Sequence, residues 1–555
     1  MKKMLLAGLI ISFLSGISAL SGTEEGLMAD LVLYNGKIFT VDTNQPWATA
    51  VAIRDGKFVA VGSDADVKKL AGKNTEMVDL KGRLALPGFN DAHVHFANGG
   101  LYLLGIDLRP ARDEKEFVSI LKVYIEKLPE GEWLTGGNWD HENWPSKKHP
   151  HKSLIDAITP DHPVLLQRLD GHMSLANSLA LKLAGITRDT PNPQGGEIVK
   201  DKKTGEPSGI LRDNACDLVN AFIPPLSRAK REQAIKAAMH HAQALGVTSI
   251  QDNSCSEDLE IYQELLAKGE LTVRVNAWRS CDFIADFARI GINAAFGGPF
   301  LRLGTVKLFV DGSMGAGTAL FFEPYADDPA TAGLPIYKEN ELNALVLAAD
   351  KAGLQVAAHA IGDKANAWIL DAFAKARAAN GVRDSRHRVE HSQVVRADDV
   401  ARFLELGVIA SIQPSHCIDD MRWAEKRIGP RVADAYRFAS FLAGGVRLAF
   451  GTDWDVEPLD PRLGLYAAVS RELPGGGPAG GWHPAEKLSL AQAIEMYTLG
   501  SAYAEFQEKV KGSVTPGKFA DLVVMENDLF EISQKEILIT PVAMTVLAGK
   551  IIFKK

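Results

Sequence analysis

The middle of the chain, from about residue 87 to residue 507, alternates short apolar segments with longer amphipathic segments. This alternation is typical of strand–helix units whose strands form a parallel sheet covered by helices. It constrains the fold strongly, because parallel strands need the crossover connections that such helices supply. Eight is the number of strands in a (β/α)8 barrel, or TIM barrel. The expected strands are 89–95, 247–251, 272–277, 304–310, 354–359, 386–391, 407–412 and 446–452.

The two ends of the chain have a different texture, in which short strands are separated by tight turns. Residues 29–86 alternate apolar and polar positions around Asn35-Gly36 and Asp55-Gly56, which predicts a hairpin-rich sheet. Residues 508–555 return to the same pattern. Because half-sheets with exposed edges are stabilised by pairing, we expect both ends to form one composite β-sandwich domain.

Residues from about 102 to 225 interrupt the alternation after the first expected strand, and they are rich in Trp, His, Pro and Gly. Loops on the catalytic face of a barrel tolerate such growth and use it for specificity. The predicted fold class is therefore α/β. It comprises a barrel over residues 87–507, an inserted subdomain after the first barrel strand, and the composite β domain.

The first 21 residues have the pattern of a signal peptide. Lys2 and Lys3 precede the apolar run 4–14, and Ala19-Leu20-Ser21 fits a small-x-small cleavage site, as Gly16-Ile17-Ser18 also does. The alternative is a short membrane anchor, but the run is too short to cross a hydrocarbon core of about 30 Å comfortably. We therefore expect a periplasmic or secreted protein with no stable membrane span after cleavage.

Composition excludes several classes of protein. Hydrophobic residues make up 46% and charged residues 23%, which is the profile of an ordinary globular chain. The net charge of −8 and the lack of phosphate-loop or zinc-finger spacings argue against nucleic-acid binding. The four cysteines form no CxxC motif, so no thiolate metal site is indicated. Free buried thiols are favoured over a bridge between Cys255 and Cys281.

Histidines and an aspartate stand where the expected strands end. His93 and His95 close LPGFNDAHVH, and residues two apart in a strand point to the same face. Lys307 lies inside an apolar strand, where an unpaired ammonium is costly. The carboxyl ends of barrel strands form the rim at which active sites develop. The candidate metal ligands are His93, His95, Lys307, His359, His391 and Asp453.

With these motifs in this order, the chain from about residue 29 onward resembles the amidohydrolase superfamily. The resemblance is to the amidohydrolase-3 type branch that contains N-substituted formamide deformylases. It rests on the segments LPGFNDAHVH, VKLFVDGSMGAGTA, AHAIGDKAN, RVEHSQ, FGTDWDVEPLDP and SVTPGKFADLVV.

The resemblance implies a centre of two divalent metal ions, of which Zn²⁺ suits the donor set best. His93 and His95 match first-strand ligands, His359 and His391 match fifth- and sixth-strand ligands, and Lys307 matches a lysine that CO₂ carboxylates. Carboxylation turns the buried cation into an anionic carbamate that bridges two metals. Asp453 matches the eighth-strand aspartate, which binds metal and acts as the acid/base.

Other residues are candidates for contacts with the substrate or for orienting the ligands. His172 lies in the segment Asp170-Gly171-His172 of the insertion, which resembles a similar segment of the related proteins. It is a second catalytic candidate that contacts the substrate or its oxyanion, and the alternative is a structural turn histidine. The remaining candidates are Asp311, Ser313, Asp363 and His416, while a structural role is favoured for Asp363 and for Glu390.

These features predict an exported metal-dependent amidohydrolase that cleaves a non-peptide C–N bond of an amide, N-acyl or N-formyl compound. A metal-activated bridging water would attack, with Asp453 as acid/base. The alternatives are an ester, lactone or cyclic-imide hydrolase with the same site, or a catalytically silent metal- or ligand-binding protein of the envelope. The expected partner is a small-molecule substrate, and a homodimer is a further expectation.

Overall fold

The structure is a computed structural model that describes residues 28–253 and 258–555. The predicted signal segment 1–21 and Cys255 lie outside these residues, so export and a free thiol at Cys255 stay predictions. Cys216, Cys281 and Cys417 are buried and free. Within the described ranges, no helix has the length and apolar character that crossing a bilayer would require.

Eight parallel strands form the central barrel, in the order β21-β20-β19-β18-β17-β15-β14-β8. The first and last strands approach one another through a parallel bridge between Val94 and Trp454. Thr452 reinforces this contact, because its backbone N–H and its hydroxyl both donate to the Asp91 carboxylate. The strands are β8 (Phe89–Val94), β14 (Val247–Asp252), β15 (Arg274–Ser280), β17 (Leu301–Phe309), β18 (Gln355–Ala360), β19 (Arg388–His391), β20 (Ile409–Ile412) and β21 (Leu448–Phe450).

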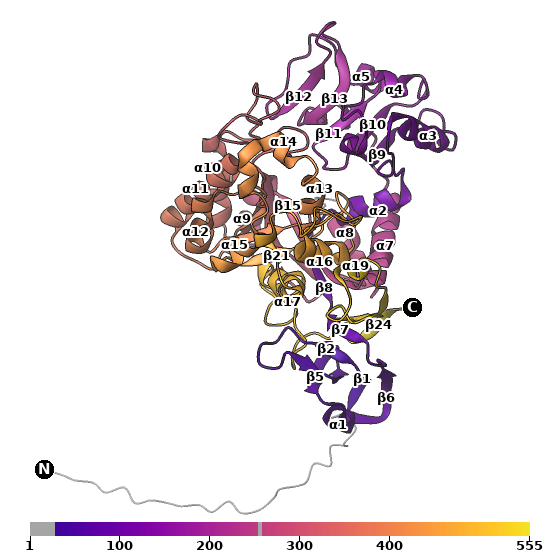
Figure 1. Ribbon diagram of the computed structural model, residues 1–555, viewed down its shortest axis with the longest axis vertical. Coiled ribbons are helices and arrows are strands. Elements are labelled where there is room, and N and C mark those ends of the chain that lie inside the picture. The colour runs from indigo at the N-terminus through magenta and orange to yellow at the C-terminus, as the bar shows by residue number, and fades with distance from the viewer. Residues whose placement is uncertain (1–27, 254–257) are drawn as a thin grey trace, which may run out of the picture.

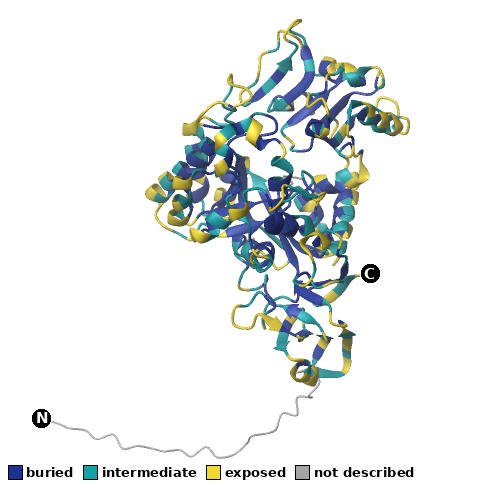
Figure 2. Cartoon of the chain, viewed as in Figure 1, coloured by how far each residue is buried: buried dark blue, intermediate teal, exposed yellow. Residues whose placement is uncertain are grey.

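All eight strands predicted from the sequence overlap one of these strands, so the predicted barrel is confirmed. Helices cover the outside of the barrel, and Figure 2 shows their exposed positions facing outward around a buried centre. A capping box formed by Ser489 and Gln492 begins α17 (Leu490–Glu495). The other main helices are α2 (Phe96–Leu104), α7 (Arg228–Ala244), α8 (Asp258–Ala267), α10 (Glu339–Lys351), α11 (Asp363–Asn380), α12 (Ala397–Leu406), α13 (Pro414–Asp420) and α16 (Pro461–Ser470).

A five-stranded sheet, in the order β12-β13-β11-β10-β9, lies in the segment between β8 and β14. In Figure 1 it stands at the top of the molecule, on the side of the barrel opposite to β1 and β6. Two further helices of this segment are α3 (Glu114–Ile125) and α5 (Ser178–Leu183). The sheet strands are β9 (Leu134–Trp139), β10 (Val164–Arg168), β11 (Met173–Ala176), β12 (Gly196–Lys200) and β13 (Pro207–Asp213).

Strands from both ends of the chain meet in a six-stranded sheet, in the order β24-β23-β22-β7-β2-β3. A separate four-stranded sheet has the order β5-β4-β1-β6. The strands of these two sheets are β1 (Ala29–Tyr34), β2 (Lys37–Phe39), β3 (Trp47–Ala48), β4 (Ala50–Arg54), β5 (Lys57–Gly62), β6 (Ala71–Asp79), β7 (Leu84–Pro87), β22 (Leu522–Met525), β23 (Val542–Leu547) and β24 (Lys550–Lys554).

One of the two predicted hairpin turns is present and the other is not. Asp55-Gly56 joins the antiparallel strands β4 and β5 with both residues at positive φ, as a tight hairpin requires. The prediction for Asn35-Gly36 is wrong, because β1 pairs with β4 and β6 while β2 pairs with β3 and β7. The chain crosses there from one sheet to the other, so the turn separates two sheets.

Candidate metal centre and active-site cavity

The six predicted ligands come together around one cavity of about 200 Å³. They reach it from the carboxyl ends of different barrel strands. His93 lies in β8, Lys307 in β17, His359 in β18 and His391 at the end of β19, while Asp453 follows β21 by three residues. Segments more than 350 residues apart in the chain therefore line the same space, because barrel closure brings their strands together.

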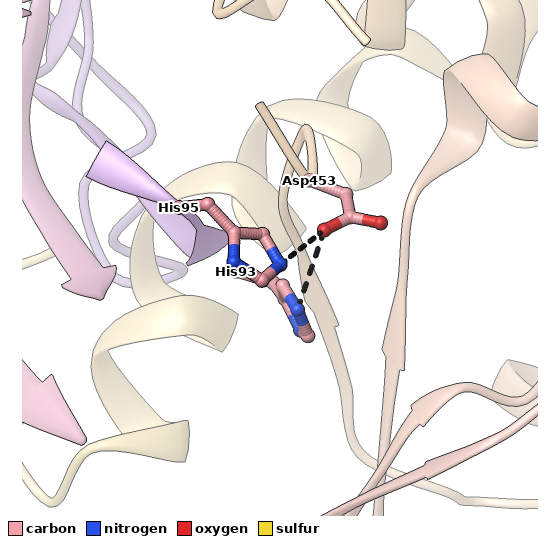
Figure 3. Close-up of side chains that lie close together, drawn as sticks. All are labelled: His93, His95 and Asp453. Atoms are coloured by element: carbon pink, nitrogen blue, oxygen red, sulfur yellow. Dashed lines mark ion pairs between the residues drawn. The ribbon is translucent and has the colours of Figure 1, made fainter. Parts of the chain in front are cut away.

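His93, His95 and Asp453 form the first group of side chains with a geometry suited to a metal ion. The Nε2 atoms of both histidines lie 3.4 Å from Oδ1 of Asp453. Figure 3 shows the two imidazoles turned toward that carboxylate oxygen. His93 is fully buried, whereas the side chain of His95 is about one-quarter exposed. One member of the pair therefore lies in the barrel interior, and the other is partly accessible to solvent.

A second group shares Asp453 and consists of His391, His416 and that aspartate. His416 Nε2 lies 3.8 Å and His391 Nδ1 lies 4.0 Å from Asp453 Oδ2. The rings of His391 and His416 lie parallel, with centroids 6.0 Å apart. His416 was predicted to contact the substrate or to orient ligands, and its position in α13 adds it to the candidate ligands.

Lys307 and His359 lie beside these groups without belonging to either. Lys307 Nζ is 3.4 Å from His93 Nε2 and sits 4.5 Å from the centre of the Phe309 ring. His359 has its ring centroid 4.5 Å from that of His391, and its Nε2 lies 3.1 Å from the Gly312 carbonyl oxygen. Both side chains are buried and line the cavity.

The donor atoms of this site fit a divalent cation. Asp453 Oδ1 and His416 Nε2 are both buried with no hydrogen-bond partner among the described residues. Burial, reinforced by the Lys307 charge, lowers the pKa of His93 to about 4. Burial also lowers the pKa of His359 and His391 well below the usual value. Neutral imidazoles and a carboxylate are ligands that divalent transition metals prefer.

Polar side chains behind the histidines fix their rings. Glu390 Oε2 accepts from His93 Nδ1 at 2.6 Å and is itself bound by Arg388. His391 Nδ1 lies 2.8 Å from Gln413 Oε1. Such partners orient a ring and select its tautomer. The bond to Glu390 occupies Nδ1 of His93 and leaves Nε2 of that ring facing Asp453. Glu390, for which a structural role was favoured, therefore orients a candidate ligand.

His172 of the insertion also lines the cavity. Its ring centroid lies 4.9 Å from that of His359, and its Nδ1 lies 2.6 Å from Oδ1 of Asp213. Burial opposes the charged ring and is the largest single effect, but the hydrogen bond to Asp213 together with the charges of Asp213, Asp170 and Asp311 outweighs it and raises the pKa of His172. Asp170 accepts from the His172 backbone N–H at 3.2 Å. The insertion thus reaches the barrel site.

The three remaining candidates have different surroundings. Asp311 is buried and accepts backbone N–H groups from Leu320, Ile361 and Gly362, with its Oδ1 3.6 Å from His359 Nε2. Ser313 lines the cavity and donates its hydroxyl to Asp170.

Asp363 does not line the cavity. It starts α11 and accepts from the Phe322 backbone N–H at 2.9 Å. The structural reading of Asp363 is therefore the better one.

Several cavity residues carried no signal in the sequence. Trp423, Asp419 and Glu457 reach the cavity from loops and short helices after the seventh and eighth barrel strands. Arg168 reaches it from the end of β10. Their positions depend on how the insertion packs on the barrel, which no local pattern encodes.

Comparison with known proteins agrees with this architecture. Residues 76–553 match the model of the family described as "Amidohydrolase family". The chain is 38% identical to Protein LONG AFTER FAR-RED 3 of Arabidopsis thaliana over 95% of its length and 92% of that protein. It is 26% identical to an N-substituted formamide deformylase of Arthrobacter pascens over 95% and 99% of the two chains.

A solved structure with a similar fold is that of an uncharacterized metal-dependent hydrolase from Pyrococcus horikoshii. The TM-score is 0.74 and the identity is 31%, and the match covers 91% of this chain and 99% of the other. The fold is therefore similar along nearly the whole length of both chains.

Proposed function

The chain belongs to the amidohydrolase family, and from that membership we propose that it is a metal-dependent hydrolase of a non-peptide C–N bond in an amide, N-acyl or N-formyl compound. The observation that carries this proposal is the buried Asp453 Oδ1, which has no hydrogen-bond partner in the described chain yet lies between two histidine Nε2 atoms. A buried carboxylate oxygen placed in this way calls for a cation.

In this proposal, two divalent ions, Zn²⁺ above all, are held by the two groups that share Asp453. His93 and His95 would hold one ion with Asp453, and His391 and His416 would hold the other with the same aspartate. Lys307, after carboxylation by CO₂, and His359 would supply further ligand atoms. Ions bound there supply a Lewis acid for the substrate carbonyl and lower the pKa of water to about 7.

Asp453 would transfer the proton of the attacking water. Asp453 is ionised, because His93 and the neighbouring histidines outweigh burial and hold its pKa well below the usual range. A carboxylate at this position accepts a proton from the attacking water through one oxygen. It then returns that proton to the departing nitrogen, so that the C–N bond breaks to give an amine and a carboxylic acid.

The metal requirement is tested first, by measuring metal content on protein purified without chelator. We expect about two metal ions per chain. A panel of N-formyl and N-acyl amines, esters, lactones and cyclic imides is then assayed for turnover before and after chelation. Absence of metal after reconstitution would refute the proposal. Turnover of esters alone would support the alternative, an ester hydrolase with the same site.

The role of Asp453 is tested with Asp453→Asn. The amide oxygen can still bind metal but cannot carry the proton, so we expect kcat to fall by about 10²–10⁴-fold while most metal is retained. Asp419→Asn is the matched control, because Asp419 lines the same cavity but is paired with Arg422. A silent binding protein would show metal uptake without turnover in every variant.

Export forms part of the proposal and rests on residues 1–21 of the sequence alone. We expect the mature protein in the periplasm or the medium, without the leader. Cell fractionation and mass spectrometry of the N-terminus test this. Recovery of the intact leader in the cytosol would refute export and would leave the proposed chemistry untouched.

A further inference from the structure

Two strands of the insertion bring a histidine and an aspartate together at the cavity wall. β11 and β13 are antiparallel, and Met173 lies opposite Arg212, so His172 and Asp213 form the next pair. The Asp213 backbone N–H donates to the His172 carbonyl oxygen at 3.0 Å. Their side chains make a second link, from His172 Nδ1 to Asp213 Oδ1 at 2.6 Å. Backbone and side chains together therefore fix the ring.

The surroundings of Asp213 hold it in a demanding conformation. Its φ is 45°, a backbone conformation that residues other than glycine adopt only at a cost in free energy. Its side chain is only 2% exposed, and Oδ2 is buried without a hydrogen-bond partner in the described residues. Strain and an unmatched buried oxygen are costs that stability alone does not explain.

The pair is docked against the barrel loop after β17. A side chain on Gly312 would place its Cβ 2.7 Å from Asp213 Oδ1, so the absence of one allows the close approach. The Gly312 carbonyl oxygen contacts His359 Nε2 at 3.1 Å. His172 therefore lies beside a candidate metal ligand, and Asp213 occupies its Nδ1. This leaves Nε2 as the ring nitrogen available to a molecule in the cavity.

We propose that Asp213 is a positioning residue that fixes His172 so that its Nε2–H donates a hydrogen bond to the carbonyl oxygen of the scissile amide. This inference rests on the proposed function. A buried carboxylate on Nδ1 orients the imidazole and stabilises its charged form, as in other His–Asp pairs. The hydrogen bond strengthens as the carbonyl oxygen becomes an oxyanion. No proton leaves His172, so the proton transfers assigned to Asp453 are unchanged.

The test uses the full-length metal-loaded protein and 4-nitroformanilide, a chromogenic N-substituted formamide, together with any better substrate from the panel. His172→Gln removes the ring but keeps an N–H donor on a shorter path, and we expect kcat to fall by about 10²–10³-fold. Asp213→Asn keeps an acceptor but removes the charge, and we expect a fall of about 10–100-fold. In both variants KM should change less than kcat.

The double variant, which combines His172→Gln with Asp213→Asn, distinguishes a positioning role of Asp213 from a purely structural one. If Asp213 acts through His172, the double variant should be no slower than His172→Gln alone. Glu197→Gln is the matched control, because it breaks the ion pair with Arg212 on the same sheet and should leave kcat unchanged. Metal content and thermal midpoint are measured for every variant. Additive losses, or wild-type kcat in Asp213→Asn, would overturn the inference.

A binding measurement removes the dependence on turnover. N-(4-nitrophenyl) methylphosphonamidate mimics the tetrahedral state, and calorimetry should show binding at least about 10-fold weaker in His172→Gln than in wild type. Equal binding would overturn the inference even if Asp213→Asn failed to fold. A wild-type protein that neither turns over any panel compound nor binds this mimic would instead refute the proposed function.

Discussion

Replacing Glu390 with Gln tests whether one buried carboxylate selects the metal-binding nitrogen of His93. Glu390 is fully buried and bonds His93 Nδ1 at 2.6 Å, while Arg388 binds both of its oxygens. Gln has nearly the same shape, but its amide nitrogen donates where the carboxylate accepted. If the amide faces His93, then Nδ1 becomes the acceptor and the hydrogen moves to Nε2. A protonated Nε2 could not bind a metal ion held beside Asp453.

The expected loss of folding stability follows from the pKa of Glu390. Burial raises the pKa of this carboxyl group, but Arg388 and His93 outweigh burial and hold it at about 2. Against about 4.3 for an unfolded glutamate, this difference contributes about 3 kcal/mol at neutral pH. The folded pKa is depressed, so this stability is present above about pH 4.3 and is lost as the pH falls toward 2. Loss of one partner of a buried ion pair costs about 3–5 kcal/mol, which agrees with the value obtained from the pKa of Glu390.

We therefore expect Glu390→Gln to lower the free energy of unfolding of the metal-free protein by about 3 kcal/mol, as measured by urea titration. We also expect metal affinity to fall by about 10–100-fold in a competition titration with a chelating dye. Glu526→Gln is the control, because its pair with Arg83 is about one-third exposed and is worth at most about 1 kcal/mol. Wild-type metal affinity in Glu390→Gln would refute the assignment of Glu390 as the group that sets the tautomer.

Two further predictions concern helix packing and substrate charge. Gly100→Ala would place a Cβ 2.0 Å from the Ala234 carbonyl oxygen, so α2 and α7 must separate. Urea titration should show a loss of about 1–3 kcal/mol. Arg168, which lines the cavity, is already bound by Asp140 and Asp170 and is not available to a substrate carboxylate. We therefore expect kcat/KM for N-formylphenylalanine to be at least about 10-fold below that for N-formylbenzylamine, and equal values would contradict this reasoning.

Much of the barrel could be predicted from the sequence because its pattern is local. Each buried strand is a short apolar run, and its carboxyl end is marked by a polar residue such as His359 or Asp453. Since all strands run in the same direction, their ends meet at one rim, and the six candidate ligands can be named without any knowledge of the distances. His416 was predicted only as a cavity residue, because it follows a strand by one turn of helix and its ring direction is set by packing.

Other features that could not be predicted depend on pairing between segments remote in the chain. Asp213 ends a strand of the insertion, and nothing near it in the sequence distinguishes it from an ordinary surface aspartate. It reaches the site only because β11 and β13 pair in one register and their sheet docks against the loop that contains Gly312. A shift of one residue in the pairing of β11 with β13 would turn the Asp213 side chain away from His172. The barrel alone thus carries the candidate ligands, whereas the proposed contact with the substrate carbonyl requires the insertion sheet to be in its native register.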